Sequence, residues 1–233
     1  MTLALPAPYK ALVVGARGAL GLAFVHHLSQ DPSCAEVVEV SRSSDEGFDL
    51  EDPQSLERLG QSLARRGPFH LIVDATGALT IDGRGPEKSL AMLRADALMR
   101  SFAVNTIGPA LLLRSLAHLL GSGDALYAKL SARVGSIADN RKGGWYGYRA
   151  SKAAMNMVLQ TAAIELQRRN PLLRVVALQP GTVRSALSAP FTAGAADLLE
   201  PAASVAGMMQ AMQRLPVRSG AYFIDHRGRD IPW

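Results

Sequence analysis

A tyrosine and a lysine stand four positions apart in the segment Tyr148-Arg-Ala-Ser-Lys152. In a helix this spacing puts both side chains on one face, so a phenol and an ammonium group can reach a common ligand. A free phenol has a pKa of about 10, and a neighbouring cation should stabilise its phenolate form. The pair therefore predicts proton transfer to or from an oxygen atom, although an ordinary exposed helix pair is the alternative for this spacing alone. Tyr146, six positions before the lysine, should point elsewhere.

A glycine-rich segment, Gly15-Ala-Arg-Gly-Ala-Leu-Gly21, separates the apolar run 11–14 from a helical pattern over 19–28. Small residues at such a turn let the backbone approach a pyrophosphate, which the N-terminus of the following helix then binds. Glycine turns are common in α/β proteins, so the pattern by itself is weak. Its position between a strand and a helix favours dinucleotide binding over a simple tight turn.

The end of the next apolar run, 36–40, bears on which dinucleotide binds. An acid at this place would hold the ribose 2′-hydroxyl of NAD. Here the run ends in Val40-Ser41-Arg42-Ser43, and Arg42 together with Arg17 offers fixed cations for a 2′-phosphate. The sequence thus favours NADP(H), with NAD(H) as the alternative. Two other readings stay open: Arg42 as a solvated loop residue, and Glu39 as the acid if the strand ends elsewhere.

Short apolar runs alternate with helical patterns along the chain. The predicted strands are 11–14, 36–40, 69–74, 125–131, 173–178 and 222–224, and the predicted helices are 19–28, 53–66, 86–103, 110–120 and 148–169. We expect the break between the third and fourth helices at Gly108-Pro109. This order predicts an α/β fold with a doubly wound parallel sheet, the Rossmann fold, as a single domain over residues 1–233. Ligands should then bind at the carboxyl ends of the strands.

The composition limits the classes of protein. Hydrophobic residues make up 48% and charged residues 19% of the chain, which suits a folded core. The single cysteine, Cys34, excludes an intramolecular disulfide, and no segment reads as a membrane span, so we expect a cytoplasmic protein. The net charge is +5, but the arginines are scattered, so we expect no nucleic-acid partner. The five histidines lack metal-ligand spacing, so we expect no metal.

Together these motifs resemble the short-chain dehydrogenase/reductase family over essentially the whole chain. The turn at 15–21 matches the family's cofactor motif, and the tyrosine and lysine match its Tyr-x-x-x-Lys. Asp74-Ala-Thr-Gly77 lies where the family has Asn-Asn-Ala-Gly, and Asn105 matches its catalytic asparagine. Pro180-Gly-Thr-Val183 matches the turn that packs beside the nicotinamide.

More narrowly, four segments are similar to C-factor-like and sniffer-type carbonyl reductases: 131–136, 143–152, 219–223 and 231–233. The resemblance implies an NADP(H)-dependent oxidoreductase that reduces a carbonyl or oxidises a secondary alcohol. Tyr148 would exchange the proton, Lys152 would also hold the nicotinamide ribose, and Asn105 would help to hold a water linked to the lysine. The alternative role for Asn105 is to satisfy backbone groups at a helix bend. The expected cofactor contacts are Gly15, Arg17, Gly18, Leu20, Gly21, Ser41, Arg42, Asp49, Leu50, Ala75, Thr76, Gly77, Asn105, Tyr148, Lys152, Pro180, Gly181, Thr182 and Val183.

The chain departs from the family at one catalytic position. Ala132 stands where the family has its substrate-orienting serine. Ser131 or Ser136 would be the substitute, or neither, since a serine at a strand end or in a loop more often bonds local backbone. This gap favours a second hypothesis, a non-catalytic dinucleotide-binding or C-factor-like signalling protein.

The expected partners are a small-molecule carbonyl or alcohol and further copies of the chain. The segment 183–199 with Trp145 and Tyr146 should line a hydrophobic substrate pocket, and its composition also predicts a mobile loop. The apolar helices near 99–119 and 148–169 correspond to the family's dimer interface, which implies a homodimer or homotetramer. The same apolar stripes would also serve to cover the sheet.

Overall fold

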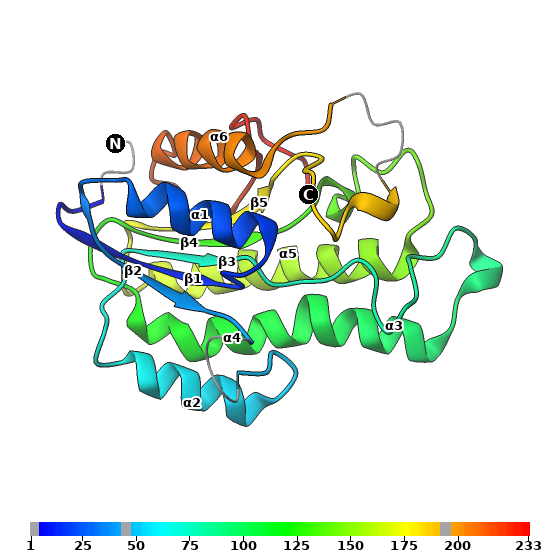
Figure 1. Ribbon diagram of the computed structural model, residues 1–233, viewed down its shortest axis with the longest axis horizontal. Coiled ribbons are helices and arrows are strands. Elements are labelled where there is room, and N and C mark those ends of the chain that lie inside the picture. The colour runs from blue at the N-terminus through cyan, green and yellow to red at the C-terminus, as the bar shows by residue number, and fades with distance from the viewer. Residues whose placement is uncertain (1–4, 43–47, 192–196) are drawn as a thin grey trace.

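A six-stranded parallel sheet with helices on both faces forms the core of the computed structural model, which describes residues 5–42, 48–191 and 197–233 (Figure 1). The strand order is β2-β1-β3-β4-β5-β6. The strands are β1 (Tyr9–Val14), β2 (Cys34–Val40), β3 (Leu71–Asp74), β4 (Ala125–Leu130), β5 (Leu173–Gln179) and β6 (Tyr222–Asp225). The helices are α1 (Ala19–Ser29), α2 (Pro53–Leu63), α3 (Ala95–Phe102), α4 (Gly108–Leu116), α5 (Tyr146–Gln167) and α6 (Pro201–Gln213). The predicted doubly wound α/β fold is confirmed.

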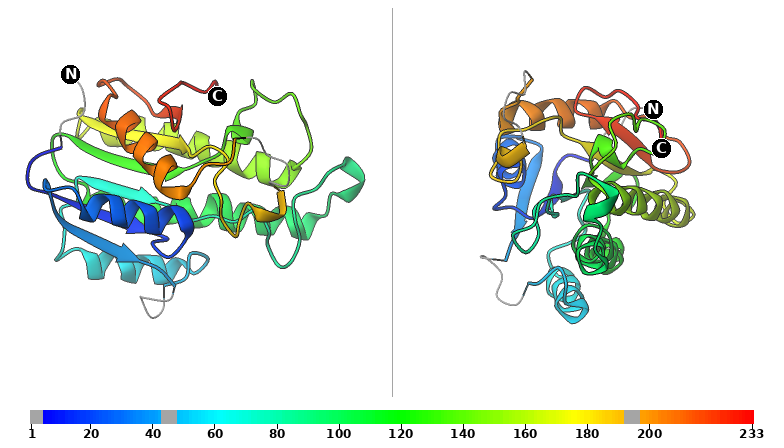
Figure 2. Two further views of the ribbon diagram at one scale, coloured as in Figure 1. Left: turned by 45° about the horizontal axis from the view of Figure 1, so that its top comes forward. Right: turned by 90° about the vertical axis from the view of Figure 1, so that its right-hand side faces the viewer.

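The strands bury side chains on both faces because successive residues point to opposite sides. In β1, Leu12 and Val14 belong to the core under α2, α4 and α5. Ala11 and Val13, which alternate with them, belong to the core under α1 and α6. The two views of Figure 2 show these helices as layers on either side of the sheet. Burial on both faces explains why the strands read as continuous apolar runs.

Two helical predictions differ from the structure. The helix expected from residue 86 begins only at Ala95, because the preceding segment contains a tight turn, Ile81–Arg84, and a short 3-10 helix, Leu90–Met92. The patterns also did not predict α6. That helix is rich in Ala and Met and contains a glycine, and its buried side includes Val205, Met208 and Met212, so its periodicity is weak.

The expected break at Gly108-Pro109 is wrong. The chain continues from α3 through a π-helical turn, Ala103–Ile107, directly into α4. Pro109 has no N–H to donate to the carbonyl of Asn105, four residues earlier, and a wider turn accommodates this loss without ending the helix. The proline therefore marks a local irregularity that contains Asn105.

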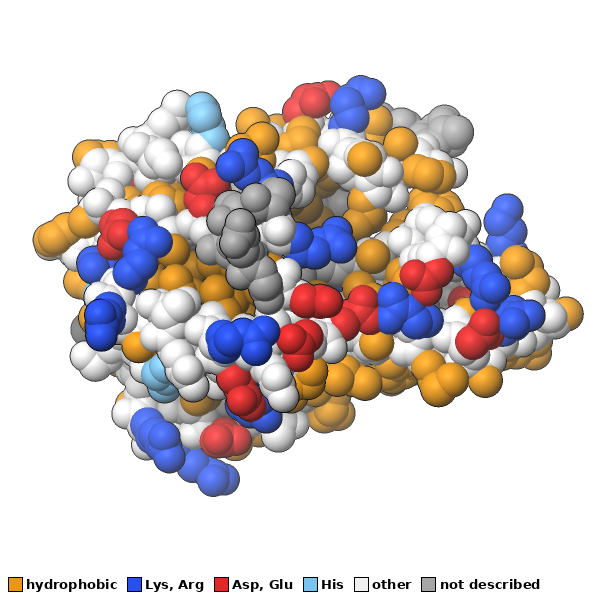
Figure 3. Space-filling view, turned by 60° about the horizontal axis from the view of Figure 1, so that its bottom comes forward, with side chains coloured by type: hydrophobic (Ala, Val, Ile, Leu, Met, Phe, Trp, Pro, Cys, Tyr) orange, Lys and Arg blue, Asp and Glu red, His pale blue; other side chains and the backbone are white. Residues whose placement is uncertain are grey.

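Charged side chains of both signs are interspersed on the face shown in Figure 3. Lys and Arg do not form an uninterrupted stripe on that face, which agrees with a solvated basic surface. Among the described residues, no helix is both long enough and apolar enough to cross a membrane.

Candidate active site

Tyr148 and Lys152 lie in the first two turns of α5. Lys152 Nζ is 5.6 Å from the centre of the Tyr148 ring. The same ammonium donates to the carbonyl of Leu130, the last residue of β4, at 3.2 Å. The lysine side chain is therefore held against the carboxyl end of the sheet, and the phenol lies beside it.

In the chain without a cofactor, burial is the main cause that shifts the pKa of both groups. It raises the pKa of Tyr148 to about 12. Burial also lowers the pKa of Lys152 to about 7, assisted by the ammonium of Lys129 and opposed by Asp74. The expectation that the lysine would lower the pKa of the phenol is thus wrong here, because the desolvation of Tyr148 dominates. The Tyr148 hydroxyl therefore keeps its proton at neutral pH.

Asn105 lies completely buried in the π-helical turn, close to the lysine. Its side-chain oxygen accepts from the N–H of Ala78 at 3.0 Å, and its amide donates to the carbonyl of the same residue at 2.9 Å. A Cβ placed on Gly77 would lie 3.0 Å from Asn105 Oδ1 and 3.3 Å from Lys152 Nζ. The turn at Gly77, the asparagine and the lysine therefore form one closely packed group.

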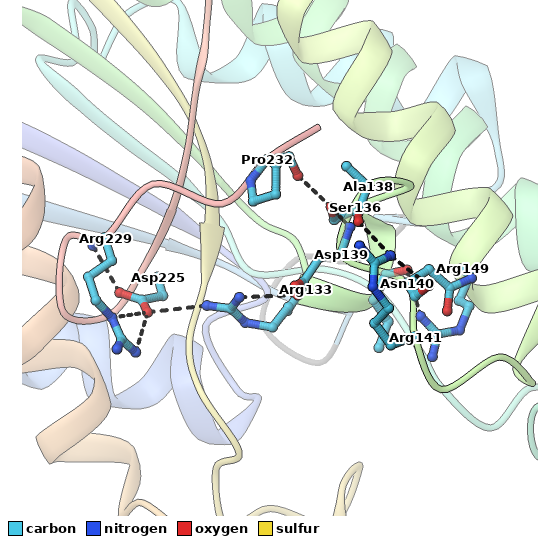
Figure 4. A network of polar contacts seen from close by, with 11 residues as sticks. Arg133, Ser136, Ala138, Asp139, Asn140, Arg141, Arg149, Asp225, Arg229 and Pro232 are labelled. Atoms are coloured by element: carbon cyan, nitrogen blue, oxygen red, sulfur yellow. Dashed lines mark hydrogen bonds and ion pairs between the residues drawn. The ribbon is translucent and has the colours of Figure 1, made fainter.

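Neither candidate serine bonds to Tyr148 or Lys152 in the described part of the chain. The Ser131 hydroxyl donates to Asn156 Oδ1 at 2.7 Å. The Ser136 hydroxyl donates to the carbonyl of Pro232 and accepts from the N–H of Asp139 at 3.0 Å, as Figure 4 shows. Both hydroxyls are engaged in structural contacts. Ala132, at the position where the family has its serine, has no side-chain donor.

A hollow of about 640 Å³ lies beyond the ends of β1, β2 and β3. Ten of the expected cofactor residues line it: Gly15, Arg17, Gly18, Ser41, Arg42, Asp49, Leu50, Ala75, Thr76 and Gly77. Leu20 and Gly21 are not among its lining residues. A Cβ on Gly21 would lie 2.1 Å from the carbonyl oxygen of Gly15, so this glycine lets α1 pack against the turn.

The two arginines expected to hold a phosphate both line this hollow and are both exposed. Neither Arg17 nor Arg42 forms an ion pair with another described residue. Glu39, the alternative acid, lies within β2 and does not line the hollow. Ser43 lies outside the described residues. The first helix also begins here without a side-chain cap, so its terminal N–H groups are available to an anion. These features fit a phosphorylated dinucleotide.

The turn at 180–183 lies at the edge of a different hollow. Gly181 and Thr182 line a space of about 550 Å³ beyond the ends of β5 and β6, together with Arg133 and His226. The carbonyl of Pro180 accepts from the Ser204 hydroxyl at 2.6 Å. This turn therefore lies beside β6 and does not line the hollow of about 640 Å³.

An aromatic contact flanks the tyrosine. The Trp145 ring lies edge-on to Tyr148, with 6.2 Å between ring centres, and edge-on to Phe191, with 5.4 Å. Tyr148 also lines a hollow of about 320 Å³ with Leu79. Tyr146 lines a separate one, as the spacing predicts, but no described residue of 183–199 lines that hollow with it, contrary to the predicted substrate pocket. The expected loop at 183–199 thus contributes Phe191, which packs against Trp145. Its residues 192–196 lie outside the described residues.

Sequence reasoning missed two charged residues near the site, Lys129 and Glu87. Lys129 is completely buried in β4, where it stands alone in an otherwise uncharged strand. Glu87 is 8% exposed and contacts the start of α5. The sequence does mark Lys129, as a lone lysine in an apolar run. No sequence signal marks Glu87. In the described part of the chain, no three His, Cys, Asp or Glu side chains gather as a metal site.

Known proteins resemble this chain in sequence and in fold. It is 29% identical over 188 residues to the 1-hydroxy-2-glutathionyl-2-methyl-3-butene dehydrogenase of Rhodococcus sp. (strain AD45), covering 80% of this chain and 79% of that protein. It is 34% identical over 139 residues to the C-signal protein of Myxococcus xanthus, covering 58% of this chain and 78% of the relative.

Solved structures agree over nearly the whole length. A short-chain dehydrogenase/reductase from Burkholderia multivorans with bound NADP superposes with a TM-score of 0.81 at 26% identity, covering 98% of this chain and 100% of that one. The NADPH-bound carbonyl reductase from chicken fatty liver, at 21% identity, shares the fold with a TM-score of 0.83 and covers 100% of this chain and 96% of its own. Residues 9–196 match the short chain dehydrogenase family. The chain belongs to this family of NAD(P)-dependent oxidoreductases.

Proposed function

We propose that this protein is an NADP(H)-dependent oxidoreductase that interconverts a carbonyl and a secondary alcohol, with Tyr148 as the proton donor or acceptor. The observation that carries the proposal is the placement of Tyr148 beside Lys152 at the carboxyl end of the sheet, with 5.6 Å between the ammonium and the ring. When bound, the dinucleotide supplies or accepts the hydride. In reduction, the neutral phenol gives its proton to the substrate oxygen as the carbonyl carbon receives the hydride.

NADP(H) is the proposed cofactor because two exposed arginines, Arg17 and Arg42, line the larger hollow. A guanidinium supplies several donors to a phosphate, and neither side chain is occupied by an acid among the described residues. The bound NADP of the Burkholderia multivorans relative supports this choice. Lys152 would hold the ribose at the nicotinamide end, and Asn105 would keep the turn at Gly77 in place beneath it.

The proposed substrate is an apolar carbonyl compound. The Trp145 ring lies beside Tyr148, and the Phe191 ring packs against Trp145 in turn. Such aromatic surfaces bind apolar or planar groups. We also propose a homo-oligomer. Four exposed apolar side chains, Met99, Ile107, Met157 and Ile164, project from the α3–α4 region and from α5, as an interface between copies would require.

A second candidate function follows from Ala132. The Ser131 and Ser136 hydroxyls both donate elsewhere, so neither serine offers the substrate oxygen a second donor beside Tyr148. This observation favours a protein that binds the dinucleotide without turnover, and the similarity to C-signal is in keeping with it. We prefer the enzyme because the tyrosine, the lysine and the asparagine are all present.

The decisive experiment follows the absorbance of NADPH with a panel of ketones, aldehydes and quinones. Tyr148→Phe should lower turnover at least about 100-fold, the usual contribution of a general acid, while NADPH still binds. Tyr146→Phe is the matched control, because it removes a nearby hydroxyl in the same helical turn, and should leave turnover unchanged. Turnover that survives in Tyr148→Phe contradicts the mechanism. NADPH binding without turnover across the panel supports the signalling alternative.

A further inference from the structure

The helix that carries the catalytic pair begins without a cap of its own. Trp145, the residue before α5, has a left-handed backbone with φ of 55°, and its side chain makes no capping bond. The first turn also contains no acidic side chain. The first N–H groups of a helix need external acceptors, and a missing local cap leaves the position of the helix start less well determined.

Glu87 supplies the missing acceptors from a segment 60 residues earlier in the chain. Its Oε2 accepts from the backbone N–H of Gly147 at 2.9 Å. Its backbone carbonyl accepts from the N–H of Trp145. Glu87 therefore accepts hydrogen bonds from two N–H groups at the start of α5. Its negative charge lies at the N-terminal end of this helix, where it is electrostatically favourable.

Several observations indicate that the carboxylate is built for this contact. The side chain is 8% exposed, and no Lys or Arg of the described residues forms an ion pair with it. A buried carboxylate without a partner would be costly, so its hydrogen bond to the helix is the main compensation. A Cβ on Gly147 would lie 2.9 Å from Glu87 Oε1, so a larger residue there would make the carboxylate shift.

The residues that Glu87 holds are those that flank the tyrosine. Tyr148 follows Gly147 directly, and the ring of Trp145 packs edge-on against the ring of Tyr148. Glu87 and Tyr148 also line the same hollow of about 320 Å³. We propose that Glu87 is a positioning residue, which fixes the start of α5 and thereby the place of the Tyr148 hydroxyl and the Trp145 ring. This inference rests on the proposed function of Tyr148.

The test compares Glu87→Ala with Glu87→Gln in the full chain. A misplaced catalytic group costs up to about 100-fold in rate, so Glu87→Ala should lower kcat by about 10- to 100-fold. The dissociation constant of NADPH should change less than about twofold, because the cofactor hollow is lined by other residues. Glu87→Gln keeps an acceptor oxygen at the same reach and should recover kcat to within about threefold of the wild type. A folded Glu87→Ala variant with unchanged kcat overturns the proposal, and so does a Gln variant as slow as the Ala variant.

Gly147→Ala tests the same contact should Glu87→Ala fail to fold. Alanine favours a helix more than glycine does, yet its Cβ would push the carboxylate away. A lower kcat without a lower melting temperature is the expected result. An unchanged kcat contradicts the inference.

A readout without turnover separates this inference from the proposed function. Trp145 and Trp233 are the two tryptophans, so in a Trp233→Phe background the fluorescence reports Trp145 alone. Glu87→Ala should shift its emission, and Glu87→Gln should not. If Tyr148→Phe stays fully active, the proposed function fails, while the fluorescence still shows whether Glu87 holds the helix start. Unchanged fluorescence in Glu87→Ala overturns the positioning role itself.

Discussion

Lys129 and Asp74 face each other across strands β4 and β3 as a completely buried ion pair, with 3.0 Å between Nζ and Oδ1. The ammonium also donates to the carbonyl of Thr76 at 2.6 Å and to its hydroxyl oxygen at 3.1 Å. Asp74 accepts from the backbone N–H and the hydroxyl of Thr76, at 2.9 and 2.6 Å. All three donors of the lysine are thus used, and the turn that leads to Gly77 is tied to the sheet.

Removal of one charge of this pair should destabilise the fold more than removal of both. Lys129→Met leaves the buried Asp74 carboxylate without its counter-charge, so we expect a loss of about 3–5 kcal/mol in the free energy of unfolding, measured in urea. The double variant Asp74→Asn, Lys129→Met should lose less, because no buried charge is left alone. Arg114→Met is the control: its exposed pair with Glu57 should contribute about 0–1 kcal/mol. Equal losses in the single and double variants would show that the charges are not coupled.

The lowered pKa of Lys152 predicts a pH dependence of stability. The unfolded chain holds this proton up to the ordinary pKa of 10.5, whereas the folded chain releases it near pH 7. Between these values the unfolded state binds more protons, so the free energy of unfolding should rise with pH, by up to about 1.4 kcal/mol per pH unit. The raised pKa of Tyr148 acts in the opposite sense only at higher pH, between 10 and about 12.

Urea unfolding of the cofactor-free protein at several pH values from 7 to about 9 checks this. Lys152→Met should remove the lysine's share of the slope, so the variant's stability should rise less steeply than that of the wild type. Parallel slopes would mean that the ammonium keeps its ordinary pKa in the fold.

Motifs within one local element were predictable from sequence. The turn at 15–21 and the pair on α5 depend on spacing inside a single strand-turn-helix or helix, and the structure brings ten of the expected cofactor residues to one hollow. Asn105 was matched by its motif, but the π-helical turn that holds it was not predicted. Pro109 predicts a break, but the π-helical turn Ala103–Ile107 accommodates it and the helix continues there.

Contacts between distant segments were not predictable in the same way. Lys129 meets Asp74 across 55 positions, and Glu87 meets Gly147 across 60. No periodicity relates such residues before the sheet order is known. The serines show the same limit: the bonds of Ser136 to Pro232, 96 positions away, and of Ser131 to Asn156 depend on the assembled fold.

The choice of cofactor can be tested at the two exposed arginines of the larger hollow. Arg17→Ala and Arg42→Ala should each raise the dissociation constant of NADPH by about 10- to 100-fold, the value of a hydrogen bond to a charged group. The affinity for NADH, which lacks the 2′-phosphate, should change little. Arg58→Ala is the control, since this arginine pairs with Asp52 outside the hollow. Equal affinity of the wild type for the two cofactors would contradict the assignment of these arginines.

Alanine substitutions at two glycines with positive φ can distinguish backbone strain from crowding of the site. Gly77 has φ of 132°, and its added Cβ would lie 3.0 Å from Asn105 Oδ1 and 3.3 Å from Lys152 Nζ. Gly83 has φ of 74°, and an added Cβ there meets nothing within 4 Å. Alanine at either position should cost about 1–3 kcal/mol of stability through backbone strain. Only Gly77→Ala should also displace the asparagine and the lysine, so it should lower kcat at least about 10-fold while Gly83→Ala keeps it. Equal kcat in the two variants would show that the turn at Gly77 does not position the catalytic lysine.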